Sequence, residues 1–128
     1  MNPPDAPSEY LVISRGQWDK DLPPETIQAA IDQFYIWLEK KVEAGQMIKG
    51  QRLATGGATV SKKGVMDGPY GETKEVIGGY WFVLAGNLQA AVEILAENPC
   101  VQCGLLFEIR PIETERASAY AVTNETPD

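Results

Sequence analysis

The sequence contains no histidine, only two cysteines and no long uninterrupted apolar run. Without an imidazole, hydrolysis by a Ser-His pair, proteolysis by a Cys-His pair and histidine ligation of zinc or haem are excluded. No apolar run approaches the roughly 18 residues of a membrane-spanning helix, so we expect no membrane span. The first residues, Met1–Asp5, lack the basic and apolar regions of a signal peptide, so we expect a cytoplasmic protein.

What is present is typical of one globular domain: 128 residues, of which 44% are hydrophobic and 23% charged. The net charge is −7, but Asp5 contributes −1 and residues 113–128 contribute −3, which leaves −3 for residues 9–112. This middle part would repel a phosphate backbone, so we expect no nucleic-acid partner. Residues 1–8 are predicted to be a loose arm, and residues 113–128 a flexible acidic tail.

The first half of the chain predicts a strand followed by a long helix. The strand covers Glu9–Arg15, and the helix covers Pro24–Ala44, beginning at a proline pair and ending before Gly45. One face of this helix is expected to pack on the core because its apolar residues recur at helical spacing. The predicted stripe consists of Ile27, Ile31, Phe34, Leu38 and Val42.

The second half predicts further strands around a shorter helix. We expect a strand over Gln51–Ala58 after a turn at Gly50, with a hairpin continuing over Ala58–Lys63. The remaining predicted elements are the strand Ile77–Ala85, a helix capped by Asn87 and stopped at Asn98-Pro99, and the strand Leu105–Arg110. The element order β-α-β-β-α-β, with a possible extra hairpin, predicts an α+β ferredoxin-like sandwich with both helices on one face of the sheet.

The strand Ile77–Ala85 is apolar on both sides, which is typical of a sheet covered on both faces. The helices can cover only one face, so the other face needs a partner. The simplest partner is a second copy in a two-fold homodimer. The residues expected on this second face are Tyr10, Val12, Tyr80, Phe82 and Leu84.

A dense motif lies in residues 65–80, which read VMDGPYGETKEVIGGY. This stretch resembles the DGPF(x)E(x)KE…GG[FY] signature of the YCII-related, or DGPF-domain, family. Gly45–Leu53, Asn98–Cys100 (in altered order) and Glu108–Ile112 resemble further segments of the same family, so the resemblance covers about residues 9–112. It implies a dimeric α/β barrel, in which two ferredoxin-like sheets pack face to face.

The resemblance implies no single reaction. Some members of the family lie beside, or are fused to, extracytoplasmic-function sigma factors, and one branch is thought to use a His-Asp pair. Asp67 matches the aspartate of the motif, but the chain has no histidine, so this pair is not carried over.

Asp67 is the first candidate residue because Gly68-Pro69 follows it directly. An Asx turn uses the amide two residues on, and proline has no N–H to donate. The carboxylate therefore either stabilises the turn through Tyr70 or Gly71, or faces a cleft as a ligand-binding or acid-base group.

The charged residues after the turn are the second set of candidates. In an extended segment Glu72 and Lys74 point to one side and Glu75 to the other, which predicts either a solvated edge or a charged rim of a cavity. We predict Asp67 and Lys74 as catalytic residues that act without histidine. The predicted ligand-binding residues are Gly68, Pro69, Glu72, Glu75, Tyr80, Glu108 and Arg110.

Cys100 and Cys103 form a CxxC motif, but no helix start follows to lower a thiol pKa, and zinc would need two further ligands. We therefore predict no metal and no cofactor. Two functions are left open. The chain binds or transforms a small molecule in a charged barrel cleft, or it is a non-catalytic dimeric interaction module, for example one linked to sigma-factor regulation.

Overall fold

The computed structural model describes residues 7–68 and 76–127. Its central sheet is fully antiparallel and has the strand order β2-β5-β1-β6. The strands are β1 (Ser8–Arg15), β2 (Met47–Arg52), β5 (Ile77–Ala85) and β6 (Leu106–Pro111). With α1 and α2 inserted between them in the predicted order, this is the ferredoxin-like α+β sandwich that the sequence predicts.

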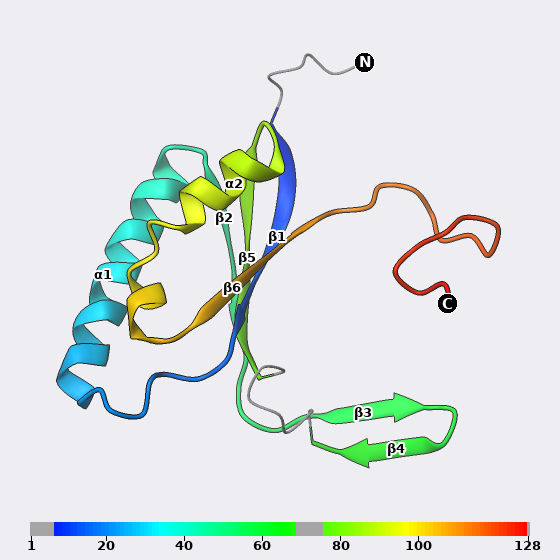
Figure 1. Ribbon diagram of the computed structural model, residues 1–128, viewed down its shortest axis with the longest axis horizontal. Helices are drawn as coiled ribbons and strands as arrows, with labels where there is room; N and C mark the ends of the chain where they lie inside the picture. The colour runs from blue at the N-terminus through cyan, green and yellow to red at the C-terminus, as the bar shows by residue number, and fades with distance from the viewer. Residues whose placement is uncertain (1–6, 69–75, 128) are drawn as a thin grey trace.

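Both helices cover the same face of the sheet (Figure 1). They are α1 (Pro24–Glu43) and α2 (Leu88–Leu95), and a short 3-10 helix, η2 (Pro99–Cys103), follows α2. Two further strands, β3 (Ala58–Ser61) and β4 (Gly64–Asp67), pair with each other as a hairpin that projects away from the helical layer. Among the described residues, no helix is long and apolar enough to cross a membrane.

Helix α1 follows its sequence signals closely. Pro24 occupies the first turn, where its missing N–H leaves no bond unmade, and Gly45 follows the helix with a positive φ of 75°. Phe34 and Leu38 are buried, while the other predicted stripe residues are half-buried. The stripe therefore forms the contact between α1 and the sheet.

Asparagine side chains begin the next two helical segments. The Asn87 Oδ1 accepts a hydrogen bond from the Ala90 amide at 2.8 Å, which caps α2 as predicted. The Asn98 Oδ1 accepts from the Cys100 amide at 2.9 Å and starts η2, with only 2% of Asn98 exposed. These caps fix the turn that brings η2 against α1.

The register of β1 corrects one prediction. Tyr10 pairs with Val83 and Val12 with Trp81, so both side chains face the helices, and they are 8% and 0% exposed. The expectation that they lie on the opposite face is wrong. β1 is apolar at four successive positions, so its composition could not show which alternate residues face the helices.

The face opposite the helices, called here the open face, carries the other alternate residues. Leu11 pairs with Phe82 and Ile13 with Tyr80, so the prediction for the two β5 aromatics is confirmed. At the two sheet edges, Ile48 and Leu106 are 42% and 59% exposed. Within the described parts of the chain, no helix covers this face.

The predicted bounds of β2 are also wrong. The strand begins at Met47 and ends at Arg52, and Gly50 lies inside it rather than in a turn. The register shifts between Ile48 and Gln51, and a Cβ built on Gly50 would lie 1.9 Å from the Tyr80 carbonyl oxygen. Glycine is required there because the two strands approach each other closely. In the sequence, a glycine required for this reason cannot be distinguished from a glycine in a turn.

Candidate functional site

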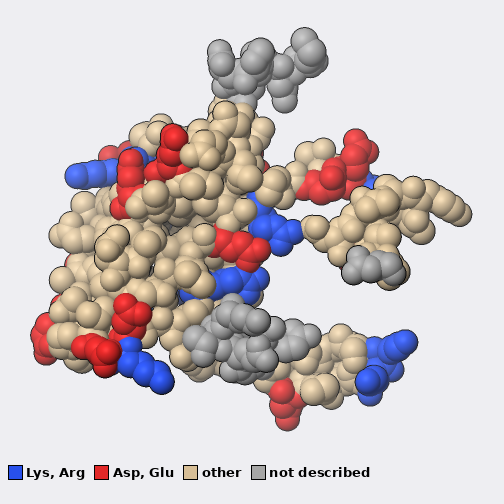
Figure 2. Space-filling model, in the orientation of Figure 1, with Lys and Arg blue, Asp and Glu red and all other residues tan. Residues whose placement is uncertain are grey.

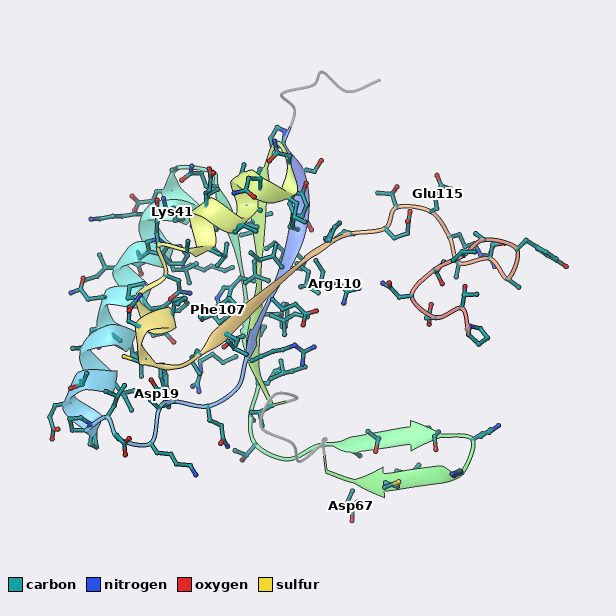
Figure 3. All side chains as sticks on the ribbon, viewed as in Figure 1. Asp19, Lys41, Asp67, Phe107, Arg110 and Glu115 are labelled. Carbon is teal, nitrogen blue, oxygen red and sulfur yellow. The ribbon has the colours of Figure 1, made fainter. Side chains whose placement is uncertain are left out.

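A cavity of about 640 Å³ lies between α1 and the helix-facing side of the sheet. Aromatic side chains from the β1–α1 loop, α1, β5 and β6 form much of its wall. These residues are Trp18, Phe34, Tyr35, Trp81 and Phe107. Phe107 lies on the helix side of β6 (Figure 3), so the cavity is part of the layer between helix and sheet.

The aromatic rings of the wall pack against one another. The Phe34 ring centroid lies 5.3 Å from that of Trp81 and 5.3 Å from that of Tyr35, and both pairs are edge-to-face. The Trp81 and Phe107 centroids are 6.4 Å apart. Aromatic pairs in these geometries restrain each other by about 0.5–1.5 kcal/mol beyond burial alone. The wall is therefore a preorganised apolar surface.

The floor of the cavity is a single row across all four strands. Gly79 of β5 pairs with Arg52 of β2 on one side and with Ser14 of β1 on the other, and Ser14 pairs with Phe107 of β6. Residues opposite each other in antiparallel strands point to the same face of the sheet. The row therefore consists of the Arg52 guanidinium, Gly79 without a side chain, the Ser14 hydroxyl and the Phe107 ring. Arg52, Ser14 and Phe107 all line the cavity.

Ser14 is the buried polar group of this floor. It is 5% exposed, and it lines the cavity. A hydroxyl on a cavity wall can donate or accept a hydrogen bond, so Ser14 offers a polar contact to a ligand or to water.

Cys100 contributes a thiol to the cavity wall from η2, and its Sγ donates a weak hydrogen bond to the Ala30 carbonyl at 3.9 Å. Burial, together with the neighbouring Cys103, raises the pKa of the Cys100 thiol to about 11. The thiol is therefore protonated at neutral pH and is a poor nucleophile. No group of three or more candidate metal ligands is found among the described residues.

The predicted site residues lie elsewhere in the fold. Asp67 is exposed at the end of β4, on the projecting hairpin (Figure 3), and Gly68 follows it with a φ of 83°. Tyr80, Glu108 and Arg110 lie on the open face, because they pair in register with Ile13 and Leu11. None of these five lines the cavity. The others, Pro69, Glu72, Lys74 and Glu75, lie outside the described residues, and the catalytic role of Asp67 and Lys74 stays a prediction.

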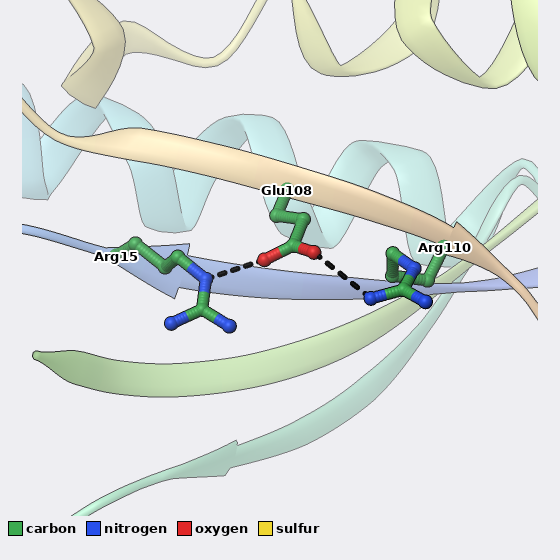
Figure 4. A network of polar contacts seen from close by, with 3 residues as sticks. All are labelled: Arg15, Glu108 and Arg110. Atoms are coloured by element: carbon green, nitrogen blue, oxygen red, sulfur yellow. Dashed lines mark hydrogen bonds and ion pairs between the residues drawn. The ribbon is translucent and has the colours of Figure 1, made fainter. Parts of the chain in front are cut away.

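Glu108 does form a charged cluster, with one partner that the sequence had not suggested (Figure 4). Its two carboxylate oxygens accept hydrogen bonds from Arg15 Nε and, at 3.2 Å, from Arg110 Nη1. The hydrogen bond from Arg15 is the main cause that lowers the pKa of Glu108, and Arg110 adds to it. The cluster joins β1 to β6 on the open face.

Charges of both signs are interspersed on the face of the molecule shown in Figure 2. The Arg15–Glu108–Arg110 cluster combines both signs within the sheet, and Lys41 pairs with Glu97 at 2.8 Å on the helical side. Arg52, in contrast, forms no ion pair with the described residues. Arg52 contributes its positive charge to the lining of the cavity.

The model of the YCII-related domain family matches residues 9–115. The chain belongs to the YCII-related domain family. The resemblance predicted from the DGPYGETKE motif is thereby confirmed, and the match covers all four strands of the sheet and both helices.

Among solved structures, this YCII-related chain is similar to a 5-chloro-2-hydroxyhydroquinone dehydrochlorinase from Burkholderia phenoliruptrix, in complex with 2,5-dihydroxybenzoquinone. The identity is 15%, the TM-score 0.41, and the alignment covers 82% of this chain and 93% of that one. It is also similar to a hydroxynitrile lyase from Passiflora edulis, with 11% identity, a TM-score of 0.43, and coverage of 90% and 100%. No curated protein matches the sequence.

Proposed function

We propose that this YCII-related protein binds a planar, largely apolar small molecule in the cavity between α1 and the sheet. The observation that carries the proposal is the ring of five aromatic side chains around a volume of about 640 Å³. Pockets for small molecules are typically about 300–1,000 Å³, mostly apolar, with a few placed polar groups. Ser14, Gln17 and Arg52 are such groups in this cavity.

The chemistry of the lining supports binding more directly than catalysis. Among the described residues, no aspartate or glutamate lines this cavity, the chain has no histidine, and burial keeps the Cys100 thiol protonated. Proton transfer needs a group whose pKa lies near the working pH. The described lining instead supplies hydrogen bonds, a positive charge and apolar contact.

Ligand-induced quenching of tryptophan fluorescence tests this proposal, because Trp18 and Trp81 both line the cavity. A panel of planar aromatic compounds is titrated into the wild type and into Gly78→Ala. A Cβ on Gly78 would lie 3.6 Å from Ser14 Oγ, an ordinary contact, so this variant should fold normally with a narrower cavity.

Gly86→Ala is the matched control because a Cβ at Gly86 meets nothing within 4 Å, and Gly86 does not line the cavity. We expect weaker binding in Gly78→Ala, unchanged binding in Gly86→Ala, and wild-type melting temperatures in both. A wild type that binds no planar aromatic compound would contradict the proposal.

A second function, pairing of two copies, is favoured by the open face. Ile48 is 42% exposed and pairs with the half-buried Phe82 at one edge of this face, and Leu106 is 59% exposed at the other edge. Exposed apolar residues on a sheet face mark interaction sites, and the family resemblance implies a face-to-face dimer. The dimer is also the assembly that the alternative function, a non-catalytic interaction module, requires.

Sedimentation equilibrium tests this pairing. Leu106→Glu places a charge at the open face and should shift a dimer towards the monomer. Val92→Glu is the control, because Val92 is 41% exposed on α2, away from the open face. A wild type that remains monomeric at micromolar concentration would contradict the pairing.

A further inference from the structure

We infer that the cavity selects planar aromatic anions, with Arg52 binding the anionic group and Ser14 hydrogen-bonding a polar substituent at the other end of the molecule. This inference rests on the proposed function, since it names the class of ligand for the same cavity. It is carried by the order of side chains along the floor and by the balance of charge around it.

The floor row fixes the separation of the two polar groups. Arg52 and Ser14 both pair with Gly79, on opposite sides of β5, so they are two strands apart. Neighbouring strands lie about 4.8 Å apart, so their Cα atoms are about 10 Å apart. A fused aromatic ring system with one substituent at each end matches this span better than a single small polar molecule does.

The gap between them is flat because no side chain fits there. A Cβ on Gly79 would lie 2.9 Å from the Gln51 carbonyl oxygen and 3.4 Å from Trp81 Cη2. The Trp81 indole therefore lies close over the backbone of Gly79. The Trp81 indole is an aromatic surface next to Gly79, and stacking on it favours a planar ligand over a bulky aliphatic one.

The charged side chains that line the cavity indicate the sign of the charge expected on the ligand. A second cavity of about 330 Å³ adjoins this one, and Arg52, Tyr35 and Trp81 line both cavities. The smaller cavity adds Lys49 and a single carboxylate, Glu39. Within the described lining of the larger cavity, Arg52 is the one charged side chain, and it favours a ligand that carries a negative charge.

Arginine suits such a role because its planar guanidinium binds carboxylates through two parallel hydrogen bonds. None of the ion pairs among the described residues includes Arg52, and its guanidinium lines the cavity. An anionic aromatic ligand would be attracted by Arg52, whereas a cationic one would be repelled.

The test compares 2-naphthoate with its neutral counterpart 2-naphthamide at neutral pH, by fluorescence titration and calorimetry. We expect the wild type to bind the carboxylate about tenfold or more tightly than the amide, the size typical of a charge-assisted hydrogen bond. Arg52→Gln should remove this preference while leaving the affinity for the amide within about twofold. Arg116→Gln, an equivalent change in the C-terminal segment, should leave the preference intact.

A second arm tests Ser14 with 6-hydroxy-2-naphthoate, which carries a hydroxyl at the end opposite the carboxylate. The wild type should bind it several-fold more tightly than 2-naphthoate, and Ser14→Ala should abolish this gain without weakening 2-naphthoate itself. An equal affinity of the wild type for the two carboxylates would overturn the role of Ser14.

Equal binding of naphthoate and naphthamide by the wild type, or an unchanged preference in Arg52→Gln, would overturn the selection of anions while leaving the cavity as a binding site. Failure of all three naphthalene probes to bind would overturn the proposed function and this inference together. The two failures are therefore distinguished by the neutral probe.

Discussion

Replacing Gly50 with alanine tests how tightly β2 is held to the rest of the sheet. The added Cβ would lie 1.9 Å from the Tyr80 carbonyl oxygen, 2.7 Å from its carbonyl carbon and 2.8 Å from Cδ2 of its ring. Two of these three atoms belong to the backbone, so rotation of a side chain cannot relieve the contact. β2 must move away from β5.

The cost of that movement follows from the bonds at both ends of β2. The Leu53 amide donates to the Gly78 carbonyl and the Leu84 amide to the Gln46 carbonyl, both at 2.8 Å. Overpacking costs about 1–3 kcal/mol, and each hydrogen bond weakened by the shift costs a further ~0.5–1.5 kcal/mol. Because β2 is an edge strand and can yield outwards, we expect a total near 3 kcal/mol.

For a chain of 128 residues, this loss lowers the melting temperature by about 10 °C. Thermal and urea denaturation of Gly50→Ala, with Gly86→Ala as control, measure the effect, and the control should melt within about 2 °C of the wild type. If Gly50→Ala also melted within about 2 °C of the wild type, the close approach of β2 and β5 would be refuted.

Three further predictions concern single groups. Because burial raises the pKa of Cys100 to about 11, alkylation of the native protein by iodoacetamide should be slow at pH 7 and accelerate up to about pH 11, as followed by mass spectrometry. Arg15 lowers the pKa of Glu108 in the folded protein. The ionised carboxylate therefore stabilises the fold at any pH above the pKa that Glu108 has in the unfolded chain, and this stabilisation is lost as the pH falls through its pKa in the folded protein. Glu108→Gln should therefore lower the free energy of unfolding by under ~1 kcal/mol at pH 7, seen as a slightly lower melting temperature, and the difference from the wild type should vanish near pH 2. Asn87→Ala removes the cap on the Ala90 amide and should cost about 1 kcal/mol in urea denaturation.

The fold was predictable because its signals are local and mutually consistent. Each helix end is fixed by a residue with a particular backbone requirement: the proline pair at the start of α1, Gly45 after α1 and Asn87 before α2. The strand Ile77–Ala85 was found with its observed bounds because it is the most apolar run of the chain. With the motif of residues 65–80, these signals sufficed for the topology and the family.

Register was less accessible than element order. In β1, four successive residues are apolar, so either alternate set could face the helices. Pairing with β5 and β6 decides which set does so. In β2, Gly50 was misread because a glycine needed for close packing and a glycine needed for a turn look alike in sequence. Both errors concern contacts between strands that are distant in the chain.

The cavity lay beyond sequence reasoning for the same reason. Charged residues such as Glu108 and Arg110 are predicted as site residues because of their type alone, yet the sheet places them on the face away from the cavity. Arg52, Ser14 and Phe107 belong to three segments separated by dozens of residues, and only the order β2-β5-β1-β6 sets them in one row. A site defined by cross-strand register has no sequence spacing of its own. Such a row becomes recognisable only once the pairing of all four strands is known, and the chemistry of its side chains then indicates the class of ligand.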